Sequence, residues 1–172
     1  MKNTITFLTL LFISLPFTSC IEDLTNVDFS TDITEKFDVH INQNQTAISQ
    51  SIILQLDNSD THDYLNNINE VSITKLTYKV TNFTGDATGS IDIEFSSDGT
   101  VLLLNDFIVK QANDNATIYE ISNVTHLNQI AAALKNNQQV ELSVSGECLA
   151  ENDDMDFDIE VTAELDIVAN PL

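Results

Sequence analysis

The last part of the chain, residues 154–167, alternates strictly between apolar and polar side chains. Every odd position is apolar: Met155, Phe157, Ile159, Val161, Ala163, Leu165 and Ile167. Every even position is polar and mostly acidic: Asp154, Asp156, Asp158, Glu160, Thr162, Glu164 and Asp166. Successive side chains on a strand point to opposite faces, so this run predicts a strand with one apolar and one acidic face. At about 3.3 Å per residue it would be roughly 45 Å long, and its apolar face needs a sheet to pack against.

Shorter runs of the same alternation recur along the chain and predict further strands. Their apolar positions are Val27 and Phe29; Phe37, Val39 and Ile41; Ile52, Leu54 and Leu56; Val71 and Ile73; Ile91, Ile93 and Phe95; residues 101–104; residues 107–109; Tyr119 and Ile121; and Val140, Leu142 and Val144. The Asp98-Gly99 pair predicts a hairpin between the strands on either side of it. The apolar parity changes near Thr74-Lys75, which predicts a bulge or a bend that could let this strand serve two sheets.

Two segments have helical spacing instead. Residues 61–68 predict a short helix that buries Tyr64, Leu65 and Ile68, and Thr125 begins a second helix that ends at Asn136-Asn137. Together these patterns predict an all-β fold, an antiparallel two-sheet β-sandwich of Ig-like or Greek-key type with about eight or nine strands and two short helices. A closed barrel is the alternative, because the last strand is so long.

The start of the chain has the pattern of a secretory leader. Lys2 is the one charged residue in residues 1–19, and an apolar stretch follows from Ile5 to Phe17. The stretch is short for a membrane-spanning helix and contains Thr, Ser and Pro. It ends in Phe17-Thr18-Ser19-Cys20, which resembles the lipobox of bacterial lipoproteins, with Phe17 in place of the usual leucine. The resemblance implies that residues 1–19 are a signal peptide and that Cys20 is lipidated, with palmitate-type acyl chains.

The residues after Cys20 resemble the acidic export tag of surface lipoproteins in the Bacteroidota. They read Ile21-Glu22-Asp23, and no aspartate follows Cys20 directly. This resemblance implies a protein anchored in the outer membrane by its lipid and exposed at the cell surface. Residues 20–27 would then form a short tether, and residues 20–172 have a length that suits a single sandwich domain.

Cys148 is the second of the two cysteines. If Cys20 carries a lipid, Cys148 is a lone thiol on an apolar alternation, and we expect it to be buried and unreactive. The alternative is a Cys20–Cys148 disulfide in an ordinary secreted protein.

The charge balance excludes one class of partner. The chain has 27 acidic residues against 6 basic ones, and its formal net charge is −21. Nucleic-acid binding depends on basic side chains that displace counterions from phosphates, so no nucleic-acid partner is expected. The same balance opposes attachment to anionic lipid through basic residues.

The acidic side chains of the last strand are the sharpest chemical feature. Neighbours on one face of a strand lie about 6.5–7 Å apart, so a calcium ion could lie between two of Asp154, Asp156 and Asp158. No segment matches an EF-hand loop, and a solvated face that discourages edge pairing explains the same residues. We therefore predict no metal or other cofactor, with calcium at these aspartates as the alternative.

No motif in the sequence indicates an enzyme. His40, His62 and His126 lack the spacing of a zinc site, and there is no Gly-x-Ser-x-Gly element. The predicted function is therefore a non-catalytic, lipid-anchored module that binds a glycan, a peptide or a partner protein. The alternatives are a structural subunit of an outer-membrane assembly, whose basic partner would meet the acidic face of the last strand, and a hydrolase of surface polymers.

Overall fold

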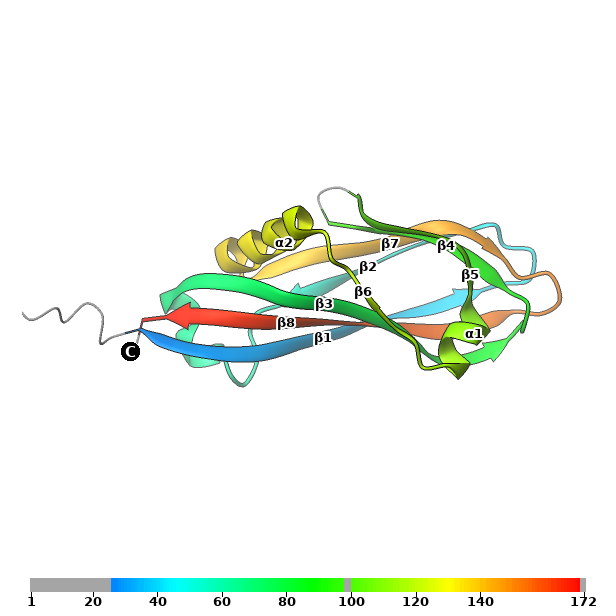
Figure 1. Cartoon of the computed structure of the whole chain (residues 1–172). Coiled ribbons are helices and arrows are strands. Elements are labelled where there is room, and N and C mark those ends of the chain that lie inside the picture. The colour runs from blue at the N-terminus through cyan, green and yellow to red at the C-terminus, as the bar shows by residue number, and fades with distance from the viewer. Residues whose placement is uncertain (1–25, 98–99, 171–172) are drawn as a thin grey trace, which may run out of the picture.

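The computed structural model describes residues 26–97 and 100–170 and consists of two antiparallel four-stranded sheets (Figure 1). Sheet A has the strand order β1-β8-β3-β6, and sheet B has the order β2-β7-β4-β5. The strands are β1 (Val27–Ile41), β2 (Ala47–Gln55), β3 (Ile68–Gly85), β4 (Ser90–Ser96), β5 (Thr100–Ile108), β6 (Ile118–Glu120), β7 (Gln139–Leu149) and β8 (Met155–Ala169). The predicted all-β sandwich is confirmed, and the closed barrel is not formed.

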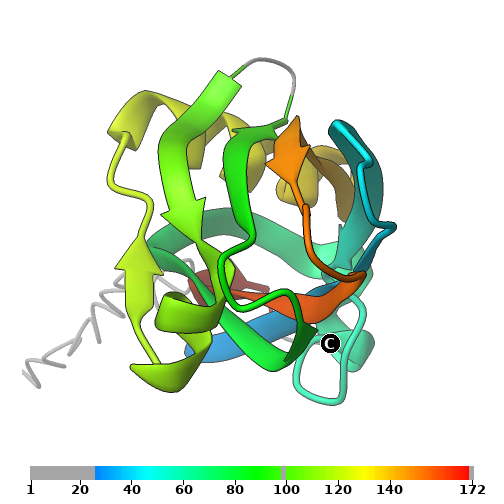
Figure 2. The same cartoon turned by 90° about the vertical axis from the view of Figure 1, so that its right-hand side faces the viewer.

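Strand β8 lies between β1 and β3 at the centre of sheet A. Its odd-numbered side chains from Met155 to Ala169 face sheet B and are at most 2% exposed. They meet the inward side chains of β2 and β7, among them Leu54, Leu142 and Val144, which are completely buried. The view along the long axis shows the two sheets on opposite sides of this core (Figure 2). The apolar side chains of residues 154–167 therefore form one buried face of a strand, as the sequence predicts.

Strand β3 is irregular where it pairs with β8. The register shifts between Ile68 and Glu70, between Ile73 and Lys75, and between Thr81 and Thr84. The middle shift confirms the bulge predicted near Thr74-Lys75. β3 nevertheless remains in sheet A along its whole length, so the suggestion that it serves two sheets is wrong.

Within the described part of the chain, three helical segments connect the strands. They are the 3-10 helix η2 (His62–Asn67) and the α-helices α1 (Val109–Asp114) and α2 (Val124–Asn137). In α2, Asn123 caps the first turn by accepting hydrogen bonds from the backbone N–H groups of Thr125 and His126. Ile130, Ala131 and Leu134 of α2 are buried.

The other two helical segments differ from the predictions. In η2, Tyr64 and Leu65 are half-buried instead of buried, and the half-buried Ile68 already belongs to β3. Of the predicted strand residues 107–109, Phe107 and Ile108 belong to β5, whereas Val109 begins α1. Val109 and Ala112, one helical turn apart, are both buried. Six residues are too few for a periodic signal, so the sequence did not predict α1.

The predicted leader (1–19), the lipidated Cys20, most of the tether and the Asp98-Gly99 turn lie outside the described residues. Strands β4 and β5, which this turn joins, do pair antiparallel as predicted. The described chain starts at one end of the sandwich, where Val27 pairs with Ala169 (Figure 1). Among the described helices, none has the length and hydrophobicity needed to cross a bilayer.

Candidate functional site

Three loops meet at the end of the sandwich opposite Val27 and Ala169, and we call them the tip. They are residues 42–46, 86–89 and 150–154, at the right-hand end of Figure 1. The backbone N–H of Gln43 donates to the Asp154 carboxylate at 2.7 Å, and its side-chain amide donates to the Glu151 carbonyl at 2.8 Å. The Asn44 N–H donates to the Ala150 carbonyl at 2.8 Å. These bonds hold the first and third loops together.

Asp86 joins the second loop to the third. Its side chain is buried, with 4% of its surface exposed. The carboxylate accepts hydrogen bonds from the Asn152 N–H at 2.9 Å, from the Thr88 hydroxyl at 2.7 Å and from the Thr88 N–H at 2.9 Å. These donors, led by the Asn152 backbone N–H, hold the pKa of Asp86 well below its usual range. Asp86 is therefore an ionised group that organises the tip.

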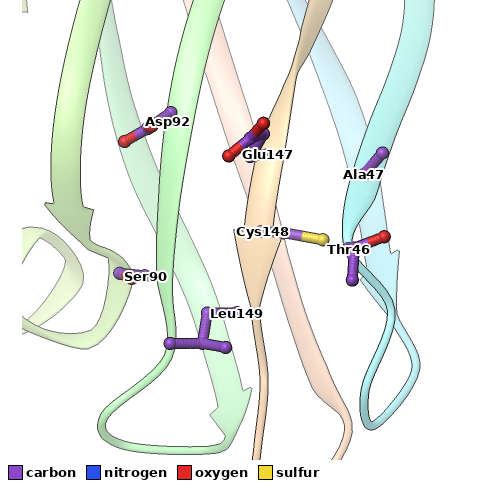
Figure 3. A pocket seen from close by; sticks show the side chains of 7 residues that line it. All are labelled: Thr46, Ala47, Ser90, Asp92, Glu147, Cys148 and Leu149. Carbon is purple, nitrogen blue, oxygen red and sulfur yellow. The ribbon is translucent and has the colours of Figure 1, made fainter.

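An open groove of about 570 Å³ lies next to the tip on the outer face of sheet B (Figure 3). Its lining residues are Thr46, Ala47, Ser90, Asp92, Glu147, Cys148 and Leu149. Strand register explains this grouping, because Glu147 of β7 is opposite Ala47 of β2, and Leu149 is opposite Ser90 of β4. Figure 3 shows Glu147 between Asp92 on one side and Ala47 on the other. The groove therefore combines two carboxylates with small polar residues and the half-exposed side chain of Leu149.

Cys148 forms part of the groove wall but belongs to the inner side of β7. The thiol is free and buried, and its Sγ donates to the Gln45 carbonyl at 3.2 Å. Burial raises the pKa of the Cys148 thiol, so less of it is in the reactive thiolate form. The predicted buried cysteine is confirmed, and Cys148 forms no disulfide within the described residues, which do not include Cys20.

The acidic side chains of β8 point outward from sheet A, as predicted, but most of them have partners on the neighbouring strands. Asp156 pairs with His40 at 2.6 Å, Asp158 with Lys36 at 3.2 Å, Glu160 with Lys79 at 2.6 Å and Glu164 with Lys75 at 3.4 Å; Asp166 accepts from the Ser30 hydroxyl at 2.6 Å. Strand pairing brings these groups together from segments more than 80 residues apart. The outward face of β8 therefore carries less uncompensated negative charge than its sequence indicates.

The three calcium candidates have separate partners in the structure. Asp154 accepts from the Gln43 N–H, Asp156 pairs with His40, and Asp158 accepts from Asn82 at 2.7 Å. The Asn82 hydrogen bond is the main reason that the pKa of Asp158 is lowered. Within residues 26–97 and 100–170, no three His, Cys, Asp or Glu side chains come together as metal ligands would. The prediction of no metal, with calcium at these aspartates as the alternative, stays a prediction.

The three histidines lie on different elements. His40 is on β1, His62 begins η2 and His126 is in the first turn of α2. Hydrogen bonds to Asp156 and Asp57 raise the pKa values of the exposed His40 and His62, respectively. None of the three lines the groove.

Sequence reasoning missed Asp86 and the groove. The Asp86-x-Thr88 pattern is a signal for a local side-chain turn, but it does not reveal Asn152 as a partner. The groove depends on the pairing of β2, β7 and β4, which come from three distant parts of the chain.

No protein-family model matches this chain, and no curated protein matches its sequence. Among solved structures, the chain is similar to the decameric BFDV capsid protein, with a TM-score of 0.45 and 13% identity over 82% of this chain and 99% of that one. It is also similar to a structure of Desmodium yellow mottle tymovirus, with a TM-score of 0.44 and 12% identity over 100% of this chain and 95% of that one. TM-scores below 0.5 do not establish a shared fold, so the sandwich is defined by the strand pairing described above.

Proposed function

We propose that this chain is a lipid-anchored protein of the bacterial outer membrane, exposed at the cell surface, and that its sandwich is a non-catalytic binding module. Cys20 carries the lipid, and residues 20–26 form the tether. The proposed location at the outer membrane is inferred from the lipobox-like sequence and from the acidic residues after Cys20.

The position of Val27 is the observation that supports an orientation with one end of the sandwich near the membrane. It pairs with Ala169 at one end of the sandwich, and the tip lies at the other end. Seven tether residues reach at most roughly 25 Å, so they would hold the Val27 end near the membrane. A 15-residue strand spans about 50 Å, so an upright sandwich would place the tip and groove far from the lipid surface.

We assign no reaction to the groove. A cysteine nucleophile acts as the thiolate, and burial disfavours that form of Cys148. The histidines that could act as general bases lie on β1, η2 and α2, outside the groove. A binding role therefore fits these residues better than hydrolysis.

The test is the location of the protein in its own cells. We expect the wild-type chain in the outer-membrane fraction, and we expect a membrane-impermeant amine label to react with its lysines in intact cells. A Cys20→Ser variant should leave the membrane fraction, whereas a Cys148→Ser variant should remain in it. If Cys20→Ser and the wild type fractionate alike, Cys20 is not the anchor and the proposal fails.

A further inference from the structure

Strand β2 is an open edge of sheet B. It pairs with β7 on one side, in continuous register, and has no neighbouring strand on the other side (Figure 2). The hydrogen bond from the Cys148 N–H to the Thr46 carbonyl, at 3.2 Å, shows that the even-numbered residues bond to β7. The odd-numbered residues Ser49, Ser51 and Ile53 therefore direct their backbone N–H and C=O groups to the open side of the sheet.

The open edge of β2 lacks the features that protect sheet edges in other proteins. Charged side chains, prolines, bulges and very short strands keep an edge from pairing with another chain. Among the eight described strands, β2 alone contains no acidic, basic or histidine side chain. It also has no proline, and its pairing with β7 has no register shift. Its outward side chains are all exposed, and they are Ala47, Ser49, Ser51, Ile53 and Gln55.

Strand β1, an edge of sheet A, is protected by contrast. It lies beside β2, and the Gln50 side chain of β2 donates to the Asp38 carbonyl of β1 at 2.9 Å. The outward positions of β1 hold three aspartates, a lysine and a histidine. Glu35 is exposed although it lies in the inward series between the buried Ile33 and Phe37, and such a charge hinders edge pairing. The contrast makes β2 a candidate interface.

The sequence of β2 is complementary to itself about Ser51, the middle residue of the strand. In an antiparallel pair of two β2 strands centred there, Ser51 lies opposite Ser51 of the second copy, and Ile53 lies opposite Ser49. The Ile53 side chain, 46% exposed in the single chain, then packs on small side chains of the other copy. The chain has a net charge of −21, so two copies approach each other most easily at a strand without charge.

We propose that β2 is a self-association edge, at which two copies of this chain pair antiparallel and join their B sheets into one continuous sheet. The contact has twofold symmetry and closes on itself, so it produces a pair and not a fibre. About six backbone hydrogen bonds form across the junction. The edge is only about 30 Å long, so it buries less than the roughly 800 Å² per partner of a standard interface, and the pair is weak.

The inference goes beyond the proposed function and does not depend on the lipid anchor. Antiparallel pairing reverses one copy relative to the other, so the Val27 end of each copy lies beside the tip of its partner. Upright copies that pair in this way would therefore be anchored in two facing membranes. Many weak pairs between two such surfaces act together, so each single pair need not be strong.

Disulfide trapping tests the register of the pair in the full chain with Cys20→Ser, which cannot be lipidated at that residue. Ser51→Cys places two thiols opposite each other with their Cα atoms about 5.5 Å apart, within the range of a disulfide. We expect at least fivefold more disulfide-linked dimer from it than from Ser49→Cys or Ile53→Cys, whose thiols lie four residues apart along the paired strands. Thr34→Cys, in the middle of β1, is the matched control and should also give little dimer. Equal yields from all four variants would overturn the proposal.

Sedimentation equilibrium tests the pairing without an added thiol. The mean mass of the Cys20→Ser chain should rise towards that of a dimer as its concentration increases, and added salt should strengthen the pairing by screening the repulsion between two acidic chains. Ser51→Lys should remain a monomer, because two lysines would face each other. Thr34→Lys, with the same change in net charge, should pair like its parent, and thermal melts check that both variants are folded.

A parent chain that stays monomeric at every concentration and salt, or a Ser51→Lys variant that still pairs, would overturn this inference alone. Both measurements use a chain without the lipidated cysteine, so their failure is distinct from a failure of the proposed anchor, which the membrane fractionation tests.

Discussion

At the scale of single residues, Asp86 is the group whose charge matters most for the tip. Asp86→Asn replaces an acceptor of several hydrogen bonds with an amide that can accept at one atom only, and we expect the melting temperature to fall by roughly 5 °C. Differential scanning calorimetry measures this change. Asp63→Asn, at an exposed site on η2, should leave the melting temperature within about 1 °C. Equal effects of the two substitutions would show that Asp86 does not organise the tip.

The lowered pKa of Asp86 also predicts how stability depends on pH. In the unfolded chain an aspartate has a pKa of about 3.9, and in the fold the pKa of Asp86 is lower. Between these two values the unfolded state binds more protons, so the contribution of Asp86 is complete above about pH 4 and is lost as the pH falls through the folded pKa. Urea unfolding of the wild type and of Asp86→Asn at several pH values should therefore give free energies that converge below pH 4. A difference that stays constant down to acid pH would contradict this account.

Gly85 is needed for a different reason. Its φ is +101°, and a Cβ added there would lie 1.9 Å from the Asp154 carbonyl oxygen. Gly85→Ala should reduce the free energy of unfolding by about 3 kcal/mol or more, because both the backbone conformation and the close contact oppose a side chain. At Gly89, the nearest atom to an added Cβ is the sulfur of Met155, at 2.7 Å on a flexible side chain. Gly89→Ala should therefore cost clearly less by urea unfolding, and the reverse order would refute the tip geometry.

At the scale of secondary-structure elements, the two faces of β8 should differ greatly in their contributions to stability. Ile159 is completely buried, so Ile159→Ala should cost about 2–5 kcal/mol. Glu160, the next residue, forms a partly exposed ion pair with Lys79, and Glu160→Gln should cost less than about 1 kcal/mol. Chemical denaturation of both variants measures the contrast. Similar costs would mean that the ion pairs, and not the apolar face, hold sheet A together.

The elements also show what can be predicted from this sequence. Strand β8 and helix α2 were predictable because each has a long periodic pattern that the fold uses to bury one face. Helix α1 was not predictable, because Val109 and Ala112 are buried only through contact with the rest of the sandwich. The partners of the β8 acids were not predictable either. Lys36 and Lys79 meet Asp158 and Glu160 through strand pairing, which no local pattern encodes.

At the scale of the whole molecule, the sandwich has two different ends and two different outer faces. The Val27 end is where a tether would join, and the tip is at the far end. Most acids of β8 in sheet A have partners on neighbouring strands, whereas the strands of sheet B contain no lysine, arginine or histidine. The net charge of −21 alone could not reveal this asymmetry. The asymmetry depends on which sheet contains the lysines. A lipid on Cys20 would turn the difference between the two ends into a defined orientation at the cell surface.

The most direct test of a lipid anchor at Cys20 is the intact mass of the protein purified from its own membranes, measured beside a Cys20→Ala variant. We predict the mass of residues 20–172 plus a diacylglyceryl group and an acyl chain, and the variant should lack both additions. The bare mass of residues 20–172 would contradict the lipid anchor. That mass less two hydrogens would instead indicate a Cys20–Cys148 disulfide and a freely secreted protein.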